Sequence, residues 1–118
     1  MAITSEIIGK LGGGAEVDSF PVSGTASGTG GSAEILATIE VPAGETWLIA
    51  AIGEMSAAAT AAASQPALEL GSEWSEKYRP SSKMGVATVA TGSVPLRLVR
   101  NTGTGTDSFT GHVYTVKM

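Results

Sequence analysis

The side chains that could carry acid–base or nucleophilic chemistry are few in this 118-residue sequence. His112 is the only histidine, and there is no cysteine. A metal site needs several His, Cys, Asp or Glu ligands. A Ser–His–acid triad would have to combine His112 with Asp107 and one of many serines, without a G-x-S-x-G nucleophile motif. We therefore expect His112 to be an ordinary strand residue, and we expect no catalytic residue, no metal and no cofactor.

Two further patterns look like chemical sites only superficially. Glu73 and Glu76 flank Trp74, but two carboxylates in one loop rarely keep the separation across a cleft that a glycosidase needs. The glycine-rich residues 12–14 and 28–31 lack the Gly-Lys-Ser/Thr of a phosphate-binding loop. The sequence predicts a solvated acidic loop and glycine turns at these places, and the protein is not expected to be an enzyme.

Residues 74–80 (WSEKYRP) form the one unusual patch of the sequence. They bring together Trp74, Tyr78 and Arg79, which are the residue types that dominate the energetics of protein–protein interfaces. Aromatic faces can also stack on sugar rings. Three interpretations follow: the two aromatic side chains fold back as a lid over an open end of the domain, they form a protein interface, or they contact a glycan.

The elements that must position these side chains are short strands. Runs of alternating apolar and polar residues are separated by Gly-, Ser- and Thr-rich connections. The pattern predicts one all-β domain over residues 16–118, a β-sandwich or jelly roll of about seven to eight short antiparallel strands. The expected strands are residues 16–22, 32–41, 46–53, 66–71, 86–91, 94–100 and 108–117.

Turn signals predict two pairings. Residues 32–41 and 46–53 flank the turn sequence Pro-Ala-Gly-Glu, which predicts a hairpin. Residues 94–100 and 108–117 are expected to form a final pair. Residues 55–64 are rich in alanine and followed by a proline, and they fit either a strand end with a close-packed connection or a short helix.

Side-chain positions within the strands can also be predicted. Pro21 places the first strand at a sheet edge or at a strand end, and Trp47 is expected in the core. Residues 23–31 are expected to be a flexible connection, and residues 71–83 a long loop. One face of the second strand is expected to carry Ala33, Ile35, Ala37, Ile39 and Val41, with Leu36 as the exception to the alternation.

Residues 1–15 are expected to form an N-terminal arm, helical or extended. Ile3, Ile7, Ile8 and Leu11 recur at near-helical spacing and precede three glycines that would end a helix. Such a short helix is unstable alone, so the arm would dock either on its own sheet or on a neighbouring molecule.

Composition excludes several classes of partner. The net charge is −4 and the seven Lys and Arg residues are scattered, so nucleic-acid binding is not expected. No apolar run approaches the roughly 20 residues that span a bilayer, and the start does not read as a signal peptide. With 16 glycines and 5% aromatic residues, the fold is expected to gain part of its stability from neighbouring subunits.

Residues 41–47 (VPAGETW) carry a family resemblance. They resemble the strand, Pro-x-Gly-x-Thr, apolar-strand opening of small β-sandwich virion proteins of tailed bacteriophages. Residues 94–118 look like the last hairpin of such proteins, and the opening MAITSEIIGKLGGG looks like small structural proteins of phage heads and tails. The resemblance implies a virion structural protein, most simply a capsid decoration protein made in the host cytoplasm.

Such a protein would bind the capsid surface as a homo-oligomer, typically a trimer, and would clamp the major capsid protein or another virion protein. The alternative is a tail-tip or fibre-associated module that binds a host receptor or glycan. A carbohydrate-binding domain outside any virus and a small hydrolase are weaker alternatives. The candidate partner-contact residues are Ile3, Ile7, Ile8 and Leu11 in the arm, and Trp74, Tyr78 and Arg79 in the loop.

Overall fold

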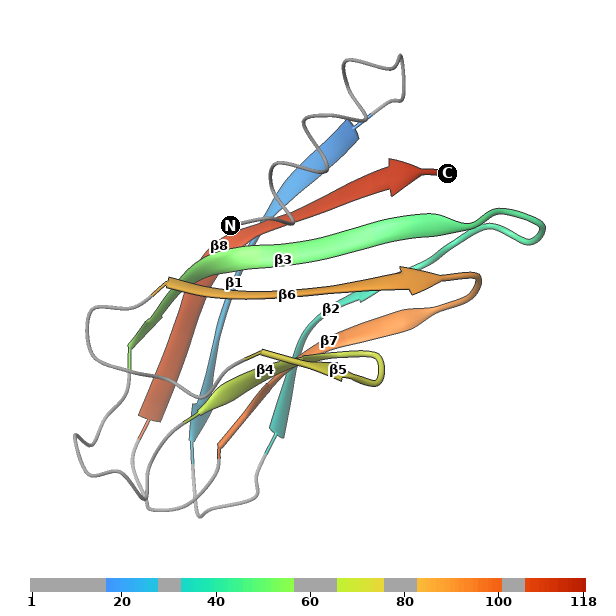
Figure 1. Cartoon of the computed structure of the whole chain (residues 1–118). Coiled ribbons are helices and arrows are strands. Elements are labelled where there is room, and N and C mark those ends of the chain that lie inside the picture. The colour runs from blue at the N-terminus through green and yellow to red at the C-terminus, as the bar shows by residue number, and fades with distance from the viewer. Residues whose placement is uncertain (1–16, 28–32, 57–65, 76–82, 101–105) are drawn as a thin grey trace.

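Eight strands form two sheets in the computed structural model of the chain, which describes residues 17–27, 33–56, 66–75, 83–100 and 106–118 (Figure 1). Each sheet has four strands, and all the strand pairs are antiparallel. The predicted all-β sandwich is confirmed. The strands are β1 (Val17–Ser27), β2 (Ala33–Ile39), β3 (Trp47–Ser56), β4 (Ala67–Leu70), β5 (Glu73–Trp74), β6 (Lys83–Ala90), β7 (Val94–Val99) and β8 (Thr106–Lys117).

The order of the strands is that of a jelly roll. One sheet has the order β1-β8-β3-β6 and the other the order β2-β7-β4-β5, as expected when the chain winds back and forth between two packed layers. Only β4 and β5 are consecutive strands that share a sheet. Figure 1 shows the two layers, with β3 and β6 in the upper one and β4 and β5 in the lower one.

The core lies between the two sheets and is built almost wholly from aliphatic side chains. Alternate residues of each strand point inward, so the lower sheet contributes four leucines and the upper sheet mainly branched residues and one phenylalanine. These side chains have 0–1% of their surface exposed. They are Leu68, Leu70, Leu96 and Leu98 from one sheet and Ile49, Phe109 and Val113 from the other.

Both predicted hairpins are wrong. β2 pairs with β7, whereas β3 pairs with β6 and β8, so β2 and β3 belong to different sheets. β7 and β8 are likewise in different sheets. Turn residues such as Pro and Gly indicate that the chain reverses direction. The same residue types occur whether the reversal joins two strands of one sheet or two strands of different sheets.

The turn at residues 42–45 is real but joins the two layers. The backbone N–H of Glu45 donates to the carbonyl of Pro42 at 3.0 Å, and Gly44 has φ +82°. Glycine adopts such a φ without the clash that a Cβ would cause.

Replacing Gly44 by alanine should therefore cost about 1 kcal/mol of unfolding free energy, through the positive φ alone. A Cβ at this position would meet no atom within 4 Å, so packing adds nothing to the loss. Urea denaturation of Gly44→Ala measures it, with Gly92→Ala as control because that site is equally open and its φ is not in the left-handed region. Equal stability of the two variants would contradict the explanation.

Four strands extend beyond their expected bounds and one strand, β5, was not expected. β3 continues to Ser56, and β6 and β8 begin at Lys83 and Thr106, two to three residues earlier than expected. β1 continues to Ser27 because its last residues pair with β8 as far as Ser27 opposite Thr106. β5 lies inside the expected long loop, since the turn at Gly71, with φ +61°, lets Glu73 pair back on Leu70. Pro21 does lie in an edge strand, as predicted, because the sheet order ends at β1.

The predicted alternation of β2 fails at its centre. The pairing with β7 shifts between Ile35 and Ala37, so Leu36 is the extra residue of a bulge. The bulge changes the face on which the preceding residues lie. Ile35 is 59% exposed instead of buried, whereas Leu36 and Ala37 pack against the core and Ile39 is buried within it.

Two further predictions fall wholly or partly outside the described residues: the N-terminal arm at 1–15, and the alanine-rich residues 57–64. β3 itself ends at Ser56. The structure therefore leaves the conformation of both segments as predictions.

Candidate interaction face

His112 and Asp107, the two residues that a catalytic triad would need, lie on opposite faces of one strand. His112 is exposed on the outer face of β8, where its ring centroid is 6.2 Å from that of Tyr114. Asp107 is only 1% exposed and belongs to the inner face of β8. They cannot form a triad, and the described residues contain no group of three His, Cys, Asp or Glu that could hold a metal ion.

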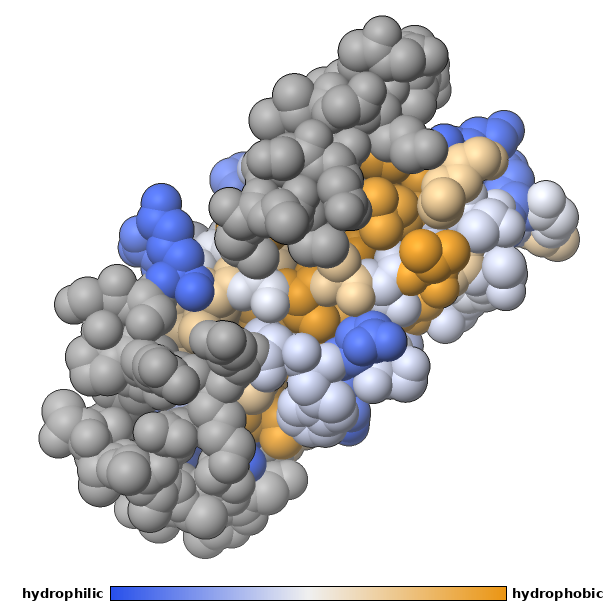
Figure 2. Space-filling view, viewed as in Figure 1, coloured by the Kyte–Doolittle hydropathy of each residue, from blue (hydrophilic) through white to orange (hydrophobic). Residues whose placement is uncertain are grey.

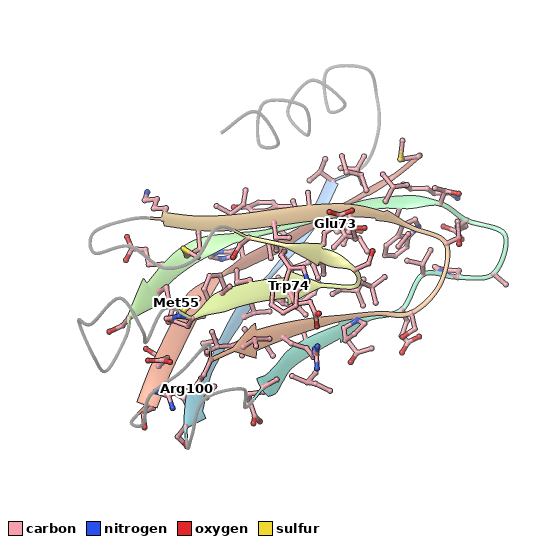
Figure 3. The ribbon with its side chains drawn as sticks, turned by 60° about the horizontal axis from the view of Figure 1, so that its bottom comes forward. Met55, Glu73, Trp74 and Arg100 are labelled. Carbon is pink, nitrogen blue, oxygen red and sulfur yellow. The ribbon has the colours of Figure 1, made fainter. Side chains whose placement is uncertain are left out.

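Asp107 has a structural partner instead. The Arg100 Nε donates to its Oδ2 at 2.7 Å, and the two side chains are 0% and 1% exposed. Arg100 directly follows β7 and Asp107 is the second residue of β8, so the ion pair joins the two layers at one end of the sandwich (Figure 3). Asp107 is the carboxylate nearest to His112 in the sequence, and this ion pair gives it a structural role in place of a catalytic one.

Of the three candidate contact residues in 74–80, Trp74 is the one that the structure describes. It lies in β5, opposite Glu69 of β4, and 52% of its surface is exposed (Figure 3). A side chain this exposed does not act as a lid over the core. The interface and glycan interpretations both need an accessible ring and both stay open. The other site candidates, Ile3, Ile7, Ile8, Leu11, Tyr78 and Arg79, lie outside the described residues, as does Glu76.

Trp74 belongs to a row of side chains that crosses the outer face of its sheet. The registers place Ile35 of β2 opposite Arg97 of β7, Arg97 opposite Glu69 of β4, and Glu69 opposite Trp74 of β5. The flanking leucines of β4 and β7 point inward, so these four side chains point outward. We call Ile35, Arg97, Glu69 and Trp74 the Trp74 row; three strand spacings make it about 14 Å long.

The centre of the Trp74 row is an ion pair and its ends are apolar. Arg97 donates to the Glu69 carboxylate through both Nε and Nη2, and their side chains are 37% and 13% exposed. Ile35 and Trp74, at the two ends, are 59% and 52% exposed. The ion pair fixes the guanidinium beside the Glu69 carboxylate, so that the row presents a charged centre between two large apolar side chains.

This arrangement suits binding more than chemistry. Exposed tryptophan and arginine are the residue types most enriched among energetically dominant interface contacts, and a sheet face supplies a rigid platform for them. Sequence reasoning identified Trp74 but missed the other three. The isolated charges of ALEL and VPLRLV were the available signal, because a lone charge between inward leucines marks the outer face.

A second surface feature lies at the edge between β1 and β2. A shallow groove there is lined by Asp18 and Phe20 from β1, by Thr38 of β2 and Glu40 directly after it, and by Trp47. Trp47 is half-buried as its ring packs against the core, and its Nε1 donates to the Glu45 carboxylate at 2.9 Å. The expectation that Trp47 belongs to the core is thus confirmed in part.

Comparison of the chain with protein-family models, curated proteins and solved structures found no match. Within the described ranges, no helix has the length and apolar character required to cross a membrane.

Proposed function

We propose that the protein is a non-enzymatic virion structural protein, most simply a capsid decoration protein that binds the head lattice as a symmetric homo-oligomer. The Trp74 row is the observation that carries the proposal: an exposed Trp and Ile on either side of a partly exposed Arg–Glu ion pair, all on the outer face of one sheet. Jelly rolls are recurrent in viral capsid and lectin domains, which supports the proposal at the level of fold. The resemblance of residues 41–47 to phage virion proteins supports it at the level of sequence.

The proposed mechanism is binding without chemistry. A decoration protein adds contact area across adjacent capsid subunits, so that their separation requires breaking its contacts as well. The Trp74 row would lie in such an interface, and its partly exposed ion pair would set orientation more than affinity. The partners are further copies of this chain and the major capsid protein or another virion protein.

Sedimentation velocity of the purified chain over a wide concentration range tests self-association. A discrete trimer or other small closed oligomer is expected. A folded protein that stays monomeric throughout, and that also fails to bind assembled capsid shells in co-sedimentation, would overturn the proposal.

Trp74→Ala should weaken this association at least about tenfold, because truncation of a hot-spot tryptophan costs about 2 kcal/mol or more and each 1.4 kcal/mol is about tenfold in the dissociation constant. The dissociation constant from sedimentation equilibrium gives the effect. Phe20→Ala, in the other sheet and 36% exposed, is the matched aromatic control and should leave it unchanged. Equal effects of the two substitutions would remove the Trp74 row from the interface.

The alternative function is recognition of a host receptor or glycan by a tail-tip or fibre-associated module. The specific observation in its favour is the same half-exposed indole, which could stack on a sugar ring. Saturable binding to a glycan array that Trp74→Ala abolishes, in a chain that does not self-associate, would favour this alternative.

A further inference from the structure

The outer face of the β1-β8-β3-β6 sheet carries a second, different row of side chains. The registers place Val17 of β1 opposite Val116 of β8, Val116 opposite Leu48 of β3, and Leu48 opposite Val89 of β6. Each of the four strands thus contributes one aliphatic side chain to a line that crosses the whole sheet. We call Val17, Val116, Leu48 and Val89 the aliphatic row.

The apolar character of this face is confined to one end. Beside the aliphatic row lie Tyr114, Ala50 and Ala87, which form one cluster with all its members except Val89. At the far end of the same face, Glu54 of β3 lies between Thr110 and Lys83. Figure 2, in the orientation of Figure 1, shows apolar side chains gathered over β3 and β6.

The burial of this face is not explained by the strands. All eight described strands belong to one of the two sheets, so none of them lies over it. Nevertheless Val116 and Ala50 are 0% exposed, and Leu48 is only partly exposed, whereas Val89 at the edge is 57% exposed. A further apolar segment that covers the centre of the aliphatic row would account for this burial.

We infer that residues 3–11 of the same chain occupy this face, as an amphipathic helix laid across the aliphatic row. At 100° per residue, Ile3, Ile7, Ile8 and Leu11 fall within about 140° of one another, with Gly9 on the opposite side. Nine helical residues are about 13 Å long, and the row crosses three strand spacings, about 14 Å.

The chain connection favours this occupant over a second copy. Residues 12–16 (GGGAE) lead directly to Val17, which is itself part of the aliphatic row. A short glycine-rich link gives the segment an effective concentration in the millimolar range at its own sheet. The inference is independent of the proposed function. It assigns the arm to its own sheet and leaves the Trp74 row, on the opposite side of the sandwich, for partners.

Paramagnetic NMR of the full chain tests this placement. Because the sequence contains no cysteine, a nitroxide on Gly9→Cys is the only label, on the side of the helix away from the sheet. Strong loss of amide signal is expected at Leu48, Val89 and Val116, and little loss at Thr110. Signal loss spread evenly over both sheets, or none on this face, would refute the inference.

A mixture of spin-labelled unenriched chain with unlabelled ¹⁵N chain separates the two possible sources of the arm. If the arm lies on its own sheet, the ¹⁵N spectrum of the mixture keeps its full signal. Loss at the aliphatic row in the mixture would show that a second copy supplies the arm, which would overturn the proposal.

Two glutamate substitutions in the labelled chain supply the matched control. Ile7→Glu puts a charge on the apolar side of the helix and should abolish the selective signal loss. Ser5→Glu puts the same charge on the opposite side and should retain it. Retention in both variants would show that the apolar side of the segment does not contact the sheet.

Discussion

Replacing Asp107 by alanine should lower the free energy of unfolding by about 3–5 kcal/mol, because it leaves the buried Arg100 guanidinium without its carboxylate. The two side chains are 0% and 1% exposed and their hydrogen bond is 2.7 Å long, so water cannot replace the lost partner without opening the end of the sandwich. Urea or guanidinium denaturation followed by tryptophan fluorescence measures the loss.

The matched control removes both charges at once. Arg100→Met combined with Asp107→Leu should recover most of the stability, since apolar side chains of similar volume often replace a buried ion pair without net loss. The expected recovery separates the cost of an uncompensated charge from the cost of lost packing. A double variant as unstable as Asp107→Ala would show that packing, not charge, dominates at this site.

Replacing Gly53 by alanine should cost about 3 kcal/mol or more, because a Cβ there collides with backbone that cannot move aside. The added carbon would lie 2.3 Å from the carbonyl oxygen of Thr110 and 2.6 Å from the Cα of Gly111. Gly53 and Gly111 face each other in the β3–β8 pairing. A methyl group at this point would force the two central strands of the sheet apart.

Gly92→Ala is the control for Gly53→Ala, because an added Cβ at Gly92 meets no atom within 4 Å. It should leave the unfolding free energy within about 0.5 kcal/mol of the parent value. Equal losses in the two variants would contradict close strand approach as the explanation, because loss of glycine's conformational freedom in the unfolded chain would by itself stabilise both variants.

The positions of the strands could be predicted from the sequence, but their partners could not. Alternation and turn residues are local signals, and they located the segments that became β2, β3, β7 and β8 to within a few residues. Pairing in a jelly roll is set by which inward side chains fill the space between layers. β3 is an example. It pairs with β6 and β8, whereas β2 belongs to the other sheet, although the turn sequence Pro-Ala-Gly-Glu lies between β2 and β3 in the chain.

Of the four residues of the Trp74 row, only Trp74 could be assigned to a candidate site from the sequence. Trp74 was identified because residues 74–80 bring together Trp, Tyr and Arg, the residue types that dominate interface energetics. Ile35 was assigned to the wrong face because a bulge shifts the register at Leu36. The break in the alternation at Leu36 was the available signal, but it was interpreted as an exception and not as the extra residue of a bulge. Arg97 and Glu69 become a pair only through the β4–β7 register, which no local pattern encodes.

The place of β8 between β1 and β3 has a consequence for how the molecule comes into being. β8 is made on the ribosome after the seven other strands, yet it is the strand that joins β1 to β3. Until it emerges, β1 has no neighbour in its sheet, and that sheet consists of β3 and β6 alone. Such non-local pairing makes folding slow relative to local architectures. The nascent chain must therefore pass through an open, partly paired state, and its last-made strand converts that state into the closed sandwich.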